Sequence, residues 1–116
     1  MKDIAKAMQG SKFHLQPRFT TIYHPIREEL GLSVNDYVII DSIHQLSHKP
    51  DHPWCVQSKD AMGEFTGLSR STVFRAIEEG LNKGLLEKNE RGDLRTTHEW
   101  YTKVMVYKQK TSKSHD

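Results

Sequence analysis

The first long run of apolar residues with helical spacing lies in residues 34–47. Ser33 is a suitable N-cap for this segment, and Asp36 stands at the capping-box position three residues later. The positions that would face a core are Tyr37, Ile39, Ile40, Ile43 and Leu46. Because they recur at helical spacing, the pattern predicts an amphipathic helix from Val34 to about Ser47.

Residues 58–88 have the pattern of two helices joined by a tight turn and followed by a strand. Val73, Ile77 and Leu81 form an apolar stripe at i, i+4 and i+8 on the second helix, which is predicted over residues 69–83. Gly67 can take the positive φ that ends the first helix. Gly63 is small enough to let the second helix cross closely.

A β-hairpin is predicted after this helix pair. Residues 85–88 form its first strand, and residues 89–93 have the composition of a turn. The returning strand has two candidates. It can follow at once from Leu94, or it can lie in residues 101–107, where the β propensity is stronger and residues 90–100 become a long wing loop.

The remaining segments set the expected boundaries of the domain. Residues 1–12 are predicted to be a flexible N-terminus, and residues 108–116 a disordered polar tail. Residues 13–107 between them are predicted to form one domain. Its smaller elements are an extended segment over 19–23, a helical turn over 25–30 and a short strand over 54–57.

Composition narrows the class of protein. The chain has 116 residues, of which 35% are hydrophobic and 28% charged, so a modest single core is expected. The single cysteine, Cys55, excludes an intramolecular disulfide and fits a reducing compartment. No apolar run approaches the roughly 20 residues of a membrane span, and the N-terminus lacks the apolar core of a signal peptide. We therefore expect a cytoplasmic protein without membrane partners.

Charge is distributed unevenly along a chain whose formal net charge is only +2. Residues 31–65 contain two lysines and five acidic residues, whereas residues 66–116 contain ten Lys and Arg against seven Asp and Glu. Positive charge is thus displaced toward the half with the helix pair, as expected for a surface that faces phosphates.

The polar face of the helix predicted over 69–83 carries the candidate binding residues. Opposite its apolar stripe lie Ser71, Thr72, Arg75, Glu78 and Asn82. A helix anchored on one side, with short hydroxyls and an arginine near its N-terminal end, suits the major groove of DNA. Arg75 can contact guanine bidentately or bind a phosphate.

Two stretches carry a resemblance to a known family. The phrase GLSRSTVFRAI…LNKGLLEK resembles the recognition-helix signature of GntR-type regulators and of phage or plasmid replication proteins. The upstream FTTIYHPIREELGLSVNDYVIIDSI is similar to the opening of replisome-organiser and replication-initiation domains. The resemblance implies an α+β, mainly α fold: a winged helix-turn-helix with a three-helix core and a C-terminal β-hairpin wing.

The family resemblance also implies which residues bind DNA. By matching position, the base and phosphate contacts would come from Ser69, Arg70, Ser71, Thr72 and Arg75, with Asn82 on the same polar face and Arg91 and Arg95 in the wing. The chain is too short for the second domain of many relatives, which binds effectors, oligomerises or loads a helicase.

These observations favour a double-stranded DNA-binding protein of phage, plasmid or bacterial replication or mobilisation. It would act as a homodimer or in tandem on repeated sites, with replication or relaxosome proteins as further partners. One alternative is a transcriptional regulator, and another is a winged helix that docks a protein. The sequence has no P-loop, nucleophile elbow or zinc-peptidase motif, so we expect no enzymatic activity and no cofactor.

Two further sets of residues have competing interpretations. His44, His48, His52 and Cys55 could in principle surround a zinc ion, which would make the regulator metal-responsive, but their spacing reproduces no standard ligand set. The aromatic residues Trp54, Phe74 and Trp100 could stack on single-stranded nucleic acid. Their spacing fits core packing better, and we assign them to the core.

Overall fold

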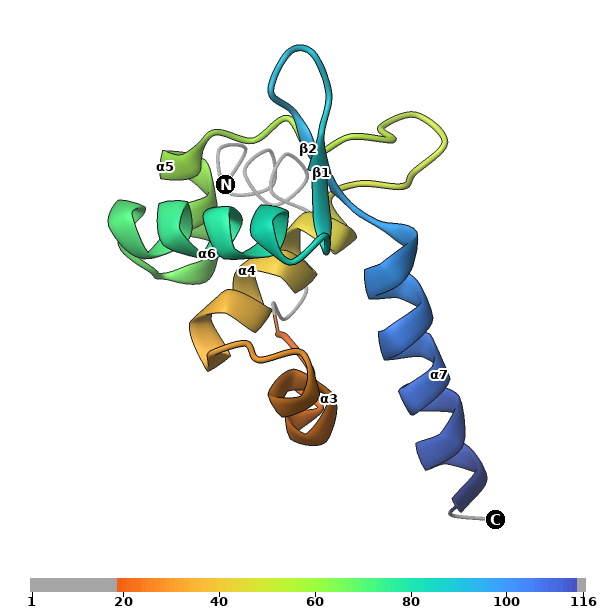
Figure 1. Ribbon diagram of the computed structural model, residues 1–116. Helices are drawn as coiled ribbons and strands as arrows, with labels where there is room; N and C mark the ends of the chain where they lie inside the picture. The colour runs from red at the N-terminus through yellow and green to blue at the C-terminus, as the bar shows by residue number, and fades with distance from the viewer. Residues whose placement is uncertain (1–18, 115–116) are drawn as a thin grey trace, which may run out of the picture.

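The structure is a computed structural model that describes residues 19–114. In chain order its elements are α3 (His24–Glu29), α4 (Val34–Gln45), α5 (Lys59–Thr66), α6 (Arg70–Asn82), β1 (Leu86–Lys88), β2 (Leu94–Thr96) and α7 (His98–Ser114). The described part of the chain is therefore mainly helical with one small antiparallel sheet, as expected (Figure 1). The N-terminus predicted over residues 1–12 lies outside the described residues, as do residues 13–18, 115 and 116.

The core lies where α4 and α6 pack on each other. α4 contributes the predicted residues Tyr37, Ile39, Ile40 and Ile43, and α6 contributes Val73, Ala76 and Ile77, all of them buried. Gly80 lets α6 lie close to both β1 and α4, because a Cβ atom there would be 2.6 Å from Leu86 Cδ1 and 3.3 Å from Ile40 Cδ1. The apolar stripes read from the sequence therefore face each other.

The first long helix begins as its capping box predicts. Ser33 Oγ accepts a hydrogen bond from Asp36 N at 3.1 Å, and the Asp36 carboxylate accepts one from Ser33 N at 3.3 Å. The helix ends at Gln45, two residues before the predicted end. Its last turn gives way to a loop in which His48 adopts a positive φ of 60°.

The turn between α5 and α6 consists of residues 67–69. Gly67 ends α5 with a φ of 79°, and its N–H donates to Gly63 O at 2.7 Å. A Cβ atom on Gly63 would lie 2.7 Å from Leu68 O. Gly63 is therefore required by the backbone of the turn itself, and not by a crossing helix as the sequence suggested.

The returning hairpin strand follows at once from Leu94. β1 and β2 are antiparallel with Glu87 opposite Arg95, and Asn89 Oδ1 closes the turn by accepting from Asp93 N at 2.9 Å. On its other side β2 pairs with Cys55 through a single antiparallel bridge. The strand predicted over residues 54–57 is thus reduced to one residue, and residues 19–23 form no strand.

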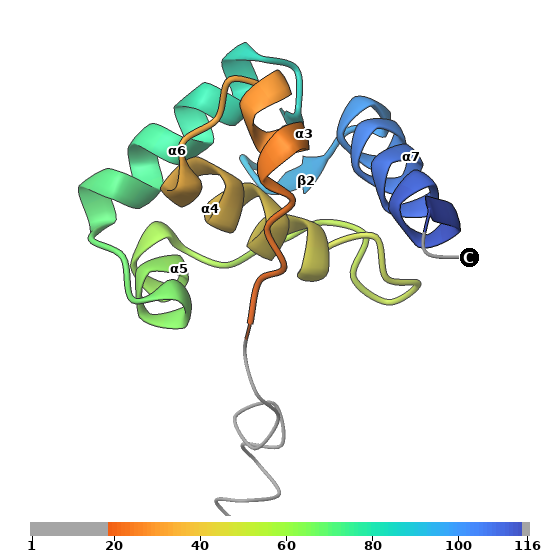
Figure 2. The same cartoon turned by 90° about the horizontal axis from the view of Figure 1, so that it is seen from below.

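The second candidate for the returning strand, residues 101–107, is wrong because these residues belong to α7. Trp100, Val104 and Tyr107 recur at helical spacing and pack against the core, which overrides the β propensity of the segment. The predicted disordered tail is also wrong up to residue 114, since α7 continues to Ser114. Figures 1 and 2 show α7 and α6 on opposite sides of α4. Within residues 19–114, none of the helices has the length and apolar character needed to span a bilayer.

Candidate nucleic-acid interface

One face of α6 is exposed along the whole helix. We call it the α6 face and define it by its exposed residues Ser71, Phe74, Arg75, Glu78 and Asn82. The opposite face holds the buried residues of the core, so α6 is anchored on one side only. The Arg75 side chain forms no ion pair or hydrogen bond with another described residue. The structure thus leaves a cationic group near the start of α6 available for a ligand.

The hydroxyl groups at the N-terminus of α6 form a local network. Ser69 Oγ accepts from Thr72 N at 3.2 Å, as expected of an N-cap, and donates to Thr72 Oγ1 at 2.9 Å. Ser71 Oγ lies 3.3 Å from Ser69 Oγ. Thr72 is half-buried, whereas Ser69 and Ser71 are both exposed. Because Ser69 caps the helix, Ser71 is the exposed hydroxyl that takes no part in capping.

The edge of the α6 face toward α5 carries further charge. Arg70 is 73% exposed along its side chain, and its Nε lies 3.5 Å from Asp60 Oδ1. Lys59 Nζ lies 5.4 Å from the centroid of the Phe74 ring. An ion pair as exposed as Arg70–Asp60 is weak, so the arginine can exchange this partner for another anion.

Phe74 corrects the sequence interpretation, which assigned this residue to packing. Its side chain is 50% exposed, while the neighbouring Val73 is completely buried. The spacing of Ser71, Phe74, Arg75 and Glu78 at i, i+3, i+4 and i+7 was the signal that places Phe74 on the polar face. Of the other two aromatic residues, Trp100 is buried and Trp54 is half-buried.

The two arginines of the hairpin have different environments. Arg91 is exposed at the tip. Arg95 Nη2 lies 2.7 Å from Glu87 Oε1 across the strand pair, and its guanidinium lies 4.1 Å from the centroid of the Trp54 ring. Arg91 is therefore available to a ligand, whereas Arg95 is held by contacts within the protein.

Two of the histidines considered as possible zinc ligands, His44 and His48, contact the second hairpin strand. His44 Nδ1 lies 2.7 Å from Thr96 Oγ1, and His48 Nε2 lies 2.9 Å from Thr96 O. Cys55 is buried, and burial raises the pKa of its thiol, whereas His52 is exposed in the loop. Among the described residues, no three His, Cys, Asp or Glu side chains are placed to hold a metal ion. The structure thus does not bring the four candidate residues together around one point.

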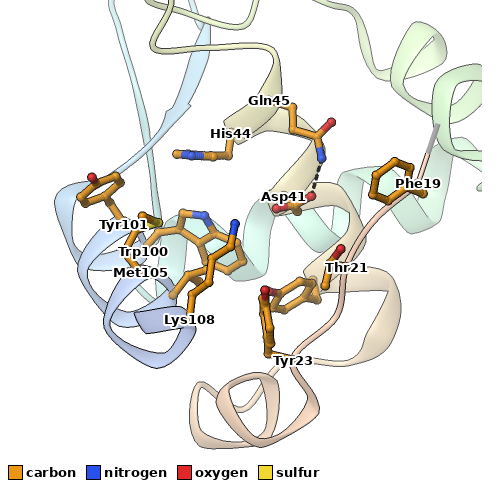
Figure 3. A pocket seen from close by; sticks show the side chains of 12 residues that line it. Phe19, Thr21, Tyr23, Asp41, His44, Gln45, Trp100, Tyr101, Met105 and Lys108 are labelled. Atoms are coloured by element: carbon orange, nitrogen blue, oxygen red, sulfur yellow. Dashed lines mark hydrogen bonds between the residues drawn. The ribbon is translucent and has the colours of Figure 1, made fainter. Parts of the chain in front are cut away.

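A cleft of about 250 Å³ separates α7 from α4 and was not expected from the sequence. Figure 3 shows Asp41, Gln45 and Lys108 at its polar side and aromatic rings around it. Gln45 Nε2 donates to Asp41 Oδ2 at 2.6 Å. Burial raises the pKa of the Asp41 carboxyl, and Gln45 and Lys108 counteract the rise. Burial thus outweighs the two favourable contacts, and the pKa of Asp41 stays above its usual value.

Comparisons with known proteins give no relative for this arrangement. No protein-family model matches the chain, and neither the curated proteins nor the solved structures contain a significant match. The function is therefore inferred from the residues and geometry of the chain itself.

Proposed function

We propose that this protein is a winged helix-turn-helix protein that binds double-stranded DNA. In this proposal α5, residues 67–69 and α6 are the helix-turn-helix, with α6 in the major groove and the hairpin of β1 and β2 as the wing. The observation that carries the proposal is the α6 face, which is polar and exposed on a helix whose other side is buried. A helix supported in this way can enter a groove about 12 Å wide without losing its packing.

The charges of the described residues support a phosphate-facing surface. Arg70 and Arg75 lie in the first two turns of α6, and Arg91 lies at the hairpin tip, all three exposed. The positive end of the α6 dipole adds to this field. We propose Arg75 as the residue that reads a base or binds a phosphate, and Arg70 and Arg91 as phosphate contacts.

We further propose a role in phage, plasmid or bacterial DNA replication or mobilisation, with transcriptional regulation as the alternative. A single α6 offers little contact area, so two copies would bind together or in tandem on repeated sites. The arrangement of the bound DNA sites distinguishes replication or mobilisation from transcriptional regulation. Direct repeats near an origin or transfer region favour replication or mobilisation, and inverted repeats at a promoter favour regulation.

The proposal is tested by selecting bound sequences from a random duplex library and titrating the enriched duplex. With three phosphate contacts, the salt dependence of about −0.9 per contact predicts roughly 40-fold weaker binding at 200 mM than at 50 mM salt. Failure to enrich any duplex at low salt, from protein that is folded by circular dichroism, would overturn the proposal.

Two variants locate the contact on the α6 face. Arg75→Ala should weaken binding by about 1–3 kcal/mol if the arginine reads a base. Glu79→Ala is the matched control, since Glu79 is on the same helix but half-buried and paired with Lys83 at 3.3 Å. Equal, small effects of the two substitutions would contradict the proposed orientation of α6.

A further inference from the structure

Phe74 is a large apolar residue on a face that is otherwise polar. It lies three residues after Ser71 and four before Glu78, in the same exposed stripe as Arg75. Half of its surface is open to solvent, although Val73 and Ile77 on the same helix are buried. The ring therefore contributes little to the core and has apolar surface that a ligand can cover.

The chemistry of the α6 face indicates what covers the ring. Lys59 Nζ lies 5.4 Å from the ring centroid, Arg70 lies one turn earlier on α6, and Arg75 is the next residue. A hydrophobic protein partner would have to desolvate these cations, whereas phosphates on both sides of a groove would pair with them. Two acids, Glu78 and Asp60, lie nearby, and the three cations outnumber them, so the surroundings of Phe74 favour a polyanion that presents an apolar group.

In duplex DNA that apolar group is the C5-methyl of thymine, which points into the major groove. We propose that Phe74 determines specificity by packing its ring against the C5-methyl group of a thymine in the site that Arg75 contacts. This inference rests on the proposed function and adds a property to it: the target contains a thymine that is read by its methyl group and not by a hydrogen bond.

The test removes only the methyl group from the DNA. In the duplex obtained by selection, each thymine is replaced in turn by deoxyuridine, and wild-type affinity is measured for each duplex. One of these duplexes should bind about fourfold more weakly than the all-thymine duplex, because it lacks the one methyl group that Phe74 would bury. Because the substitution is in the DNA, this measurement does not depend on the folding of a variant.

Variants of the protein assign that position to Phe74. Phe74→Ala should bind the thymine duplex more weakly than wild type and should bind the thymine and uracil duplexes equally. Phe74→Leu, which keeps an apolar side chain, should retain part of the discrimination. Val106→Ala is the control, because Val106 is 43% exposed but lies on α7, and it should discriminate as wild type does.

Three results would overturn the inference while leaving the proposed function intact. They are a selected site without thymine, wild-type binding that is unchanged by every uracil substitution, and a Phe74→Ala variant that still prefers thymine. If the folded wild-type protein binds no duplex, both the inference and the proposed function are wrong. If wild type discriminates between the thymine and uracil duplexes and Phe74→Ala does not, the result supports both the inference and the proposed function.

Discussion

The α6 face and the second hairpin strand each carry an arginine, but the two arginines have different surroundings. On α6, Arg75 is exposed and unpaired among the described residues. On β2, Arg95 is bound by Glu87 and lies over the Trp54 ring. The type of side chain and its nearness to the proposed DNA surface are thus insufficient to identify a binding residue. What distinguishes the two arginines is whether the protein already satisfies the charge.

The positions of the two elements explain the difference. β2 is surrounded, since it pairs with β1 on one side and with Cys55 on the other, and it also contacts α4 and α7. α6 has neighbours on one side only. We infer that β2 and its contacts join the hairpin and α7 to the helical core, whereas the α6 face remains available.

The largest expected effect in this comparison of β2 with the α6 face comes from Trp100, which anchors α7 to the core. Trp100 is 1% exposed, and its ring centroid lies 5.1 Å from that of Tyr37. Trp100→Ala should lower the free energy of unfolding by about 3–5 kcal/mol, because it leaves a large cavity. Urea denaturation measures this value.

The neighbouring Tyr101 provides the matched control for Trp100. It is 49% exposed on the same turn of α7. Tyr101→Ala should therefore lower the free energy of unfolding by no more than about 1 kcal/mol. Similar losses for both variants would show that α7 does not pack through Trp100, and the division between the two regions would then fail.

Arg95 and Arg75 should differ in opposite ways in their effects on stability and on DNA binding. Arg95→Ala removes a partly exposed ion pair and a cation–π contact, so the free energy of unfolding should fall by about 1 kcal/mol. Arg75→Ala should leave stability unchanged within about 0.5 kcal/mol. In a duplex titration the order should reverse, with Arg75→Ala the more damaging. If Arg95→Ala weakens binding as much as Arg75→Ala, Arg95 must leave Glu87 to contact DNA.

The parts of the structure that depend on neighbouring residues could be predicted from the sequence. The cap at Ser33, the turn at Gly67 and the stripes of α4 and α6 depend on residues within a few positions of one another. Such local patterns are visible in the sequence, and the structure confirms them. The exposed position of Arg75 follows from the same helical spacing.

The sequence predictions that were wrong concern segments whose structure depends on contacts between residues far apart in the chain. Residues 101–107 have β propensity, yet they are helical because Trp100 packs on Tyr37, a residue 63 positions earlier. The contact of Arg95 with Trp54 and the binding of His44 to Thr96 likewise join segments far apart in the chain. Phe74 is a different case, because its helical spacing could have placed it on the polar face.

The smallest expected effect concerns the histidine contacts that join α4 to β2. Burial, together with repulsion from His48, lowers the pKa of His44 below its usual 6.5. All three contacts are satisfied when Thr96 Oγ1 donates to a neutral His44 Nδ1 and His48 Nε2 donates to both Thr96 O and Thr96 Oγ1. Protonation of His44 turns its Nδ1 into a donor, so the Thr96 hydroxyl loses its acceptor.

Stability should therefore fall as the pH falls. The unfolded chain binds more protons than the folded chain below pH 6.5, so the contribution of neutral His44 is complete above that pH and is lost as the pH falls through the lowered pKa. Thermal unfolding between about pH 5 and pH 7.5 should show this slope, and His44→Asn should reduce it. His52→Asn is the control because His52 is exposed in the loop.

Other titrating groups near His44 must be separated from its effect. Asp41 acts in the opposite direction, since its raised pKa makes the folded state bind protons more tightly, and its contribution is lost as the pH rises. Glu87, Arg95, His98 and Tyr101 line the cavity on the other side of His44. All of these groups are present in both wild type and His44→Asn, so the difference between the two proteins reports on His44 together with its repulsion from His48. If the difference in stability between the two proteins is independent of pH, the contact of His44 with Thr96 does not couple α4 to β2. The hairpin must then be held in place by α7 through the packing of Trp100.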